Sequence, residues 1–194
     1  MELEQAGPAR QVSSESEELV LVDENDRIIG TLSKGDAHDG DGVLHRAFSI
    51  FLFDAQGRLL IQQRVADKRL WPLYWANSCC SHPRAGEEPD EAAQRRLEDE
   101  LGVRTPLEYL YKFQYQARFG DKGSENELCR VFIGRIDEAD LKPNPLEIAA
   151  WRFVGPEEVD ALIADEQAAI TPWFRMEWRR LRTEFWTRIE ALQD

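Results

Sequence analysis

The chain has 194 residues, and its 37 acidic and 24 basic side chains give a formal net charge of −13 at pH 7. That charge excludes a general nucleic-acid binder and a protein that binds acidic membranes through basic patches. Hydrophobic residues make up 42% of the sequence, which suits one folded domain, and no apolar run approaches the roughly 20 residues of a membrane helix. With three cysteines and no basic, apolar leader, a cytoplasmic location is expected.

The first residues differ in composition from the rest of the chain. They include five glutamates and little that a core could bury, so residues 1–18 are predicted to form a disordered acidic tail. Residues 19–194 are then expected to form a single domain. We expect this domain to be a monomer or a weak homo-oligomer.

Short strands are predicted for the first part of the domain. Leu19–Val22 and Ile28–Leu32 flank a turn-prone acidic segment and are predicted to be strands. A glycine- and aspartate-rich loop, residues 35–42, leads to His45–Phe53. The nearly continuous apolar run of His45–Phe53 is typical of a strand that is buried on both faces. A turn after it predicts a hairpin with residues 58–64.

The clearest helix signal lies at Pro89–Leu101. A proline suits the first turn of a helix, and Gly102 suits the left-handed residue that ends one. Before this helix, Leu73–Asn77 is a candidate strand and residues 78–88 are predicted to form a loop.

Further strands and two helices follow. Aromatic and polar residues alternate over Tyr109–Ala117, and a glycine-containing turn separates this strand from Glu125–Gly134. Trp151–Val154 is a further predicted strand and Pro156–Ala164 a short helix.

A long final helix is predicted after Thr171 and Pro172, because apolar residues recur there at helical spacing. The stripe consists of Phe174, Trp178, Leu181, Phe185, Ile189 and Leu192. The predicted fold class is therefore α/β, with a mixed sheet flanked by helices.

All three histidines of the chain occupy positions that suit metal binding. His38 lies in the glycine- and aspartate-rich loop, His45 opens a predicted strand, and His82 closely follows a pair of cysteines. Glu125 and Glu127 are two residues apart on a predicted strand, so their carboxylates point to the same face. This donor set suits a divalent transition metal better than an all-oxygen magnesium site. The alternative is three unrelated histidines and a solvated acidic strand end.

Cys80 has several interpretations. It lies in a polar loop beside a possible metal ligand, where the pKa of a thiol would be perturbed. A buried cysteine is more often a small hydrophobic residue without chemistry. A structural zinc bound by Cys79, Cys80 and His82 ranks last, because adjacent cysteines lack the usual two-residue spacer.

Four basic side chains are candidates for binding an anion: Lys34, Arg64, Lys68 and Arg96. They are scattered in sequence, so their spacing does not show that they converge. Arg96 and Glu100 are four residues apart on the predicted helix, and an ordinary solvated helix face is the plain alternative for this pair.

Several stretches match one known family in order and spacing. They are residues 77–83, residues 86–102, residues 124–129, Gly30–Lys34, Leu44–Phe48, Trp71-Pro72 with Trp75, and Thr171–Trp173. Together they resemble the type 1 isopentenyl-diphosphate Δ-isomerases, from about Leu19 to the final helix. That family is a branch of the Nudix superfamily, so the resemblance implies a Nudix-like fold.

The sequence departs from the motif of the Nudix hydrolases, Gly-x5-Glu-x7-Arg-Glu-x2-Glu-Glu-x-Gly. Aligned on Gly102, the chain keeps Glu87, Arg95 and Glu100. It has Ser81, Arg96 and Asp99 where the motif has a glycine and two glutamates. The hydrolase metal cluster is thus incomplete, which is typical of the isomerases.

The resemblance implies an activity and a set of roles. The family interconverts isopentenyl diphosphate and dimethylallyl diphosphate by a 1,3-proton shift, so the implied partner is a small diphosphate. The implied ligands of one Mn²⁺ or Zn²⁺ ion are His38, His45, His82, Glu125 and Glu127. Glu100 and the backbone carbonyl of Cys80 are the implied protein ligands of a Mg²⁺ ion that the substrate diphosphate also holds. The implied diphosphate contacts are Lys34, Arg64, Lys68 and Arg96. The implied catalytic residues are Cys80 and Glu127 as the acid/base pair, Tyr115 near the glutamate and Trp178 over the hydrocarbon.

Two other functions are alternatives to this one. A Nudix-type diphosphate hydrolase would be a different reaction on the same fold, but Arg96 stands where a catalytic glutamate belongs. A non-catalytic metal-binding module is disfavoured by the joint presence of Cys80, Glu127 and Tyr115. For Trp178, plain packing in the core is the alternative role, because it lies on the apolar stripe.

Overall fold

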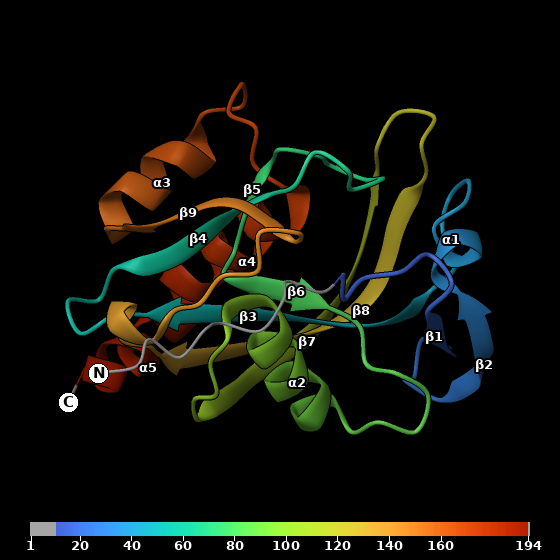
Figure 1. The fold of residues 1–194 in the computed structure, drawn as a ribbon, viewed down its shortest axis with the longest axis horizontal. Helices are drawn as coiled ribbons and strands as arrows, with labels where there is room; N and C mark the ends of the chain where they lie inside the picture. Colours follow the sequence, from blue (N-terminus) through green and yellow to red (C-terminus); the bar gives the residue numbers. More distant parts are fainter. Residues whose placement is uncertain (1–10, 194) are drawn as a thin grey trace, which may run out of the picture.

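The computed structural model describes residues 11–193, which form a nine-stranded mixed sheet with helices on both faces (Figure 1). The strands are β1 (Glu18–Val22), β2 (Ile28–Ser33), β3 (His45–Phe53), β4 (Leu59–Arg64), β5 (Trp75–Ala76), β6 (Cys79–Ser81), β7 (Leu107–Arg118), β8 (Ser124–Arg135) and β9 (Ile148–Val154). The α-helices are α1 (Lys34–Ala37), α2 (Pro89–Leu101), α3 (Pro156–Ala164), α4 (Pro172–Arg180) and α5 (Trp186–Glu190). A π-helical turn at Leu181–Phe185 joins α4 to α5, and 3₁₀ turns occur at Glu138–Asp140 and Ala191–Gln193. None of the described helices has the length and apolar character that a membrane span requires.

Strand β3 is central to the sheet and alternates between two hydrophobic cores. It runs parallel to β8 along one edge. Along its other edge it pairs antiparallel with β1 at His45, with β6 in the middle and with β4 at Phe53. Phe51 and Phe53 face the core that contains α3, α4 and α5, whereas Phe48 and Ile50 face α2. Because helices cover both faces, β3 is apolar along almost its whole length, as predicted.

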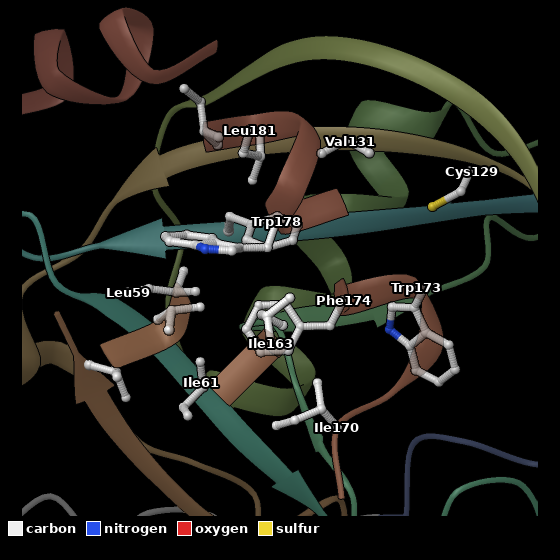
Figure 2. Close-up of a cluster of buried hydrophobic side chains, with 14 of the residues drawn as sticks. Leu59, Ile61, Cys129, Val131, Ile163, Ile170, Trp173, Phe174, Trp178 and Leu181 are labelled. Atoms are coloured by element: carbon white, nitrogen blue, oxygen red, sulfur yellow. The ribbon is translucent and has the colours of Figure 1, made fainter. Parts of the chain in front are cut away.

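The larger core lies between the sheet and the C-terminal helices (Figure 2). Phe174, Trp178 and Leu181 project from α4 and the turn after it toward Leu59 and Ile61 of β4. The apolar stripe predicted for the final helix is thus the surface that packs on the sheet, although a π-helical turn interrupts the helix.

Helix α2 has the predicted bounds, Pro89–Leu101, and both of its ends follow from local sequence. Pro89 occupies the first turn, and Gly102 ends the helix with φ +69° while its N–H donates to the carbonyl of Glu98. A Cβ atom at Gly102 would lie 2.7 Å from the Cβ atom of Lys142. The position therefore needs glycine for its backbone conformation and for space.

Two predicted loops contain short regular elements. In residues 35–42, the one-turn helix α1 begins after Ser33, whose hydroxyl accepts the N–H of Asp36. In residues 78–88, Cys79–Ser81 form β6, which is held by three residue pairs with β3. Both elements are too short for a periodic pattern, and β6 depends on a partner strand far away in sequence.

The expectation of a disordered tail over residues 1–18 is wrong for its described part. Strand β1 begins at Glu18, and the N–H groups of Val12 and Ser13 donate to Oε1 of Glu147 over 3.1 and 3.0 Å. These are backbone contacts with a residue more than a hundred positions away, so composition gave no sign of them. Residues 1–10 lie outside the described residues.

Candidate active site

The five side chains predicted to bind a transition metal meet at one end of β3 and β8. His45 opens β3, and the parallel register places it opposite Glu127 of β8. His38 follows α1, His82 follows β6, and Glu125 lies two residues before Glu127. One ligand atom from each residue lies within 4.8 Å of all the others, and all five residues are buried. We call these five residues the His/Glu cluster.

Backbone carbonyls orient two of the imidazole rings. Nδ1 of His38 lies 2.7 Å from the carbonyl oxygen of Lys34, and Nδ1 of His45 lies 2.7 Å from that of Val43. Because a carbonyl oxygen only accepts, each Nδ1 carries the hydrogen and each Nε2 keeps its lone pair. Histidines that bind metals are held in this way in proteins.

Several buried atoms of the His/Glu cluster lack a hydrogen-bond partner among the described residues. Nε2 of His38 lies 2.7 Å from Oε2 of Glu125 without hydrogen-bond geometry, and Nε2 of His45 is also unpartnered. Buried polar atoms nearly always have a partner. A divalent cation would satisfy these atoms together, and imidazole with carboxylate is a donor set that transition metals accept. The residues present therefore fit such an ion.

Glu127 links the His/Glu cluster to Tyr115. Its Oε1 lies 3.0 Å from Nε2 of His82, and its Oε2 accepts a hydrogen bond of 2.6 Å from the Tyr115 hydroxyl. Burial alone would raise the pKa of Glu127, but the neighbouring His45 imidazole and the hydrogen bond from Tyr115 bring this pKa below its ordinary value. The carboxylate form is thus the stable one.

Cys80 and Cys79 face opposite sides of β6, as their adjacent positions in an extended segment predict. Cys79 packs in the core against α2, whereas Cys80 lines a cavity on the other side. Burial raises the pKa of the Cys80 thiol to about 12. Of this pair, only Cys80 is placed for chemistry beside the His/Glu cluster.

The cavity beside the His/Glu cluster has a volume of about 190 Å³. All four basic side chains proposed from the sequence line it: Lys34, Arg64, Lys68 and Arg96. Tyr115, Glu127 and Trp173 lie on the same lining. The structure thus brings together cations that are far apart in the sequence, next to the His/Glu cluster.

A strained loop holds Arg64 in the cavity. Its Nε donates to the carbonyl of Trp71 over 3.1 Å, and its Nη2 donates to that of Leu70 over 3.0 Å. Trp71 has a φ of +47°, which is costly for a residue other than glycine. The guanidinium carbon of Arg64 also lies 5.5 Å from the ring centre of Trp173. The strained backbone therefore fixes one cation against the aromatic wall.

Sequence reasoning missed Glu147 and the N-terminal segment over the cavity. Glu147 is buried and forms an ion pair with Lys68, and it also accepts the N–H groups of residues 12 and 13. Lys34 Nζ donates to Oγ of Ser13 over 2.7 Å, and Arg96 donates to the carbonyl of Val12 over 2.8 Å. No sequence pattern signals these long-range contacts.

Trp178 does not line the cavity, which corrects its predicted place over the substrate hydrocarbon. Its side chain is 1% exposed in the core, where Nε1 donates to Asp160 over 2.7 Å and the ring stacks on Phe53. Trp173 lines the cavity instead, and Figure 2 shows it on the far side of Phe174 from Trp178. The apolar stripe identified the face of α4 that packs in the core. The cavity is lined instead by Trp173, which lies next to the stripe residue Phe174.

Glu100 lies outside the His/Glu cluster. It forms a buried ion pair with Arg96 on α2, and Gln62 Nε2 donates to its Oε2 over 3.3 Å. Arg96 is only 2% exposed. The solvated helix face that we considered for this pair is therefore wrong, because α2 turns it toward the sheet.

Comparison with known proteins finds a family model, relatives in sequence and a solved structure that are similar to this chain. A model of the NUDIX domain matches residues 43–174. Isopentenyl-diphosphate Delta-isomerase 1 of Photorhabdus laumondii is 46% identical over 84% of this chain and 93% of its own length. Isopentenyl-diphosphate Delta-isomerase of Nocardia farcinica is 47% identical over 79% of this chain and 87% of its own. A solved structure from Deinococcus radiodurans superposes with a TM-score of 0.69 and 28% identity over 84% of this chain and 98% of that one.

Proposed function

This chain belongs to the NUDIX-domain proteins and, within them, to the isopentenyl-diphosphate Δ-isomerases, and from this premise we propose which of its residues carry the reaction. The enzyme interconverts isopentenyl diphosphate and dimethylallyl diphosphate. One observation carries the assignment of residues: Cys80, the four cations and members of the His/Glu cluster border one small cavity.

We assign Cys80 and Glu127 as the acid/base pair. Isopentenyl diphosphate has an alkene without a carbonyl to polarise, so C4 must gain a proton and C2 must lose one. One of the two residues donates a proton to C4, which leaves a tertiary cation at C3. The other removes a proton from C2, and its electron pair forms the new double bond. In the reverse direction the two roles exchange, and the diphosphate is unchanged throughout.

Two aromatic residues support these proton transfers. The Tyr115 hydroxyl holds the Glu127 carboxyl by its hydrogen bond and provides a second proton-bearing group beside it. The indole of Trp173 presents an aromatic wall to the cavity, and an aromatic face stabilises a cation. A closed, largely water-free pocket is also required, since water would capture the cation at C3.

The His/Glu cluster is proposed to hold one Mn²⁺ or Zn²⁺ ion. Such an ion supplies Lewis acidity and positive charge when it is bound. The chain's own contribution is to orient the rings of His38 and His45 through their carbonyl contacts. Glu127 belongs to the same cluster, so the residues that hold the ion also position one member of the acid/base pair.

The diphosphate is proposed to lie against Lys34, Arg64, Lys68 and Arg96. These four cations bring positive charge to the lining of the cavity in a chain whose net charge is −13. Glu100 and the backbone carbonyl of Cys80 are proposed to hold Mg²⁺ together with the substrate. The ion pair between Arg96 and Glu100 then places a diphosphate contact beside a magnesium ligand.

The activity is tested by incubating the purified protein with isopentenyl diphosphate and a divalent metal, with NMR detection of both phosphorus and the alkene protons. The expected product is dimethylallyl diphosphate with its diphosphate intact, and a chelator should abolish its formation. Release of phosphate without an isomer would refute the isomerase and favour the Nudix-type hydrolase.

A further inference from the structure

Glu177 is a buried acid for which the reaction described above has no role. It lies on α4 with 0% exposure, and its Oε1 is 3.5 Å from Sγ of Cys129. The Ser49 hydroxyl oxygen lies 3.5 Å from the same sulfur, so the Cys129 thiol contacts both groups. Oε2 of Glu177 has no hydrogen-bond partner among the described residues. We call Ser49, Cys129 and Glu177 the Glu177 cluster.

The Glu177 cluster joins the elements that carry the reactive groups. Its serine lies on β3 and pairs across the sheet with Cys80 of β6. Its cysteine lies two residues after Glu127 on β8, so the two side chains share a face. Its glutamate lies four residues after Trp173 on α4, one helical turn away. Two strands and one helix thus meet in the Glu177 cluster, and a third strand, β6, pairs with β3 at Ser49.

We propose that Glu177 is a positioning residue for the isomerisation: with Cys129 and Ser49 it ties β3, β8 and α4 together and so fixes the acid/base pair relative to the Trp173 ring. This role rests on the isomerase function proposed above. Glu177 does not line the cavity and is not assigned a contact with the substrate.

The surroundings of Glu177 favour the neutral acid. The titratable and charged groups around it are Cys129 and Glu127 from β8, Cys80 from β6, Tyr111 from β7 and, on its own helix, Arg180, which stacks on the Tyr111 ring. No ion pair joins Glu177 to a cation in the described part of the chain. Burial accordingly raises the pKa of Glu177 to about 8. A neutral carboxyl can donate one hydrogen bond and accept others. A carboxylate can only accept, and burying one without a cation carries a high desolvation cost.

The test compares the metal-loaded wild type with Glu177→Gln and Glu177→Leu, measuring kcat and KM for isopentenyl diphosphate from neutral to alkaline pH. Glutamine keeps a neutral hydrogen-bonding group, so its kcat at neutral pH should stay close to wild type. Leucine removes the hydrogen bonds, and kcat should fall roughly tenfold to a hundredfold, as small misplacements of reacting groups do. KM should change little, because the diphosphate contacts lie elsewhere.

The pH profile separates positioning from simple packing. The neutral form is lost as pH rises through the pKa of about 8, so wild-type kcat should fall there, and this alkaline limb should be absent in Glu177→Gln. Ile189→Ala, a core substitution on α5 outside the Glu177 cluster, is the control. It should lower stability and retain kcat below its melting temperature.

Two results would overturn the proposal. One is a Glu177→Leu variant with wild-type kcat, and the other is an alkaline limb that is unchanged in Glu177→Gln. A wild type that does not convert isopentenyl diphosphate at all would instead refute the isomerase function, so the two failures are distinguishable.

Discussion

Tyr115 and Glu127 lie opposite each other in the antiparallel pairing of β7 and β8, and the tyrosine hydroxyl donates to Oε2 of the glutamate over 2.6 Å. The strand register alone brings these side chains together, since cross-strand partners share a face of the sheet. The same carboxyl group also belongs to the His/Glu cluster. One hydrogen bond therefore connects the His/Glu cluster to the aromatic lining of the cavity.

Loss of that hydrogen bond should slow the reaction. We expect Tyr115→Phe to reduce kcat by roughly tenfold to a hundredfold, because a hydrogen bond to a charged group contributes about 1.5–3 kcal/mol. Tyr111→Phe is the matched control on the same strand, because the Tyr111 hydroxyl has no hydrogen-bond partner among the described residues. Steady-state kinetics of the two variants check this, and equal kcat values for both would contradict it.

His82→Ala should abolish stoichiometric metal binding. The variant removes one of the five ligands, and its Nε2 is also the atom that contacts Oε1 of Glu127. Metal analysis after extensive dialysis should find about one bound transition-metal ion in the wild type and none in the variant. Cys79→Ala, which alters the opposite face of β6, should keep its metal. Full retention of metal by His82→Ala would disprove the assigned site.

Cys80→Ala should lose far more activity than either other cysteine variant. General acid–base catalysis contributes roughly 10²–10⁴ in rate, so turnover should fall by about that factor. Cys79→Ala should remain close to wild type, since it faces α2. Cys129→Ala should fall between them, because it alters the Glu177 cluster. Folding and metal content are measured for each variant, and near-normal turnover by Cys80→Ala would exclude it from the acid/base pair.

Trp173 and Trp178 should differ in what their replacement changes. Trp178→Ala opens a cavity in the core and should cost about 3–5 kcal/mol of unfolding free energy, with kcat retained in the folded fraction. Trp173→Leu should lower kcat beyond any loss of stability, because its ring lines the cavity. Urea unfolding curves and kinetics on the same samples separate the two effects. A wild-type kcat for Trp173→Leu would show that the Trp173 ring does not stabilise the cation at C3.

Glu177→Gln should stabilise the protein at alkaline pH. The folded-state pKa of about 8 lies above the ordinary value of 4.5, so the folded state holds a proton that the unfolded state has lost between these values. The contribution of Glu177 to stability therefore falls as pH rises from about 4.5 to about 8, and glutamine removes this loss. The difference in melting temperature between variant and wild type should grow over that range. A difference that is independent of pH would contradict the raised pKa.

Local signals predicted much of the secondary structure. The bounds of α2 followed from Pro89 and Gly102, because the residues that start and stop a helix lie beside it in sequence. Strand β3 followed from its own apolar run. The three-residue strand β6 did not, since only its pairing with β3 makes it a strand. The contact between the N-terminal segment and Glu147 could not be predicted either, because nothing within residues 11–17 indicates it.

The candidate site shows the same limit. The three histidines of the His/Glu cluster were candidates because histidine is rare in this chain and each lies in one of the matching motifs. The two glutamates were candidates because they lie two residues apart on a predicted strand. The aromatic residue was misplaced because Trp178 lies on a stripe with helical spacing, and that spacing identifies burial rather than contact with a ligand. Glu177 carried no sequence signal of its own. Its neighbours Ser49 and Cys129 come from two strands, β3 and β8, which are far apart in sequence and meet only in the folded protein.

The central claim is that two protein groups move protons between solvent and the substrate's carbon atoms. Brief incubation of the metal-loaded enzyme with isopentenyl diphosphate in D₂O tests it, with NMR and mass spectrometry of the product. We expect dimethylallyl diphosphate that carries one deuterium in the methyl group formed from C4 and has lost one hydrogen from C2. Product without deuterium, or phosphate released without any isomer, would contradict it.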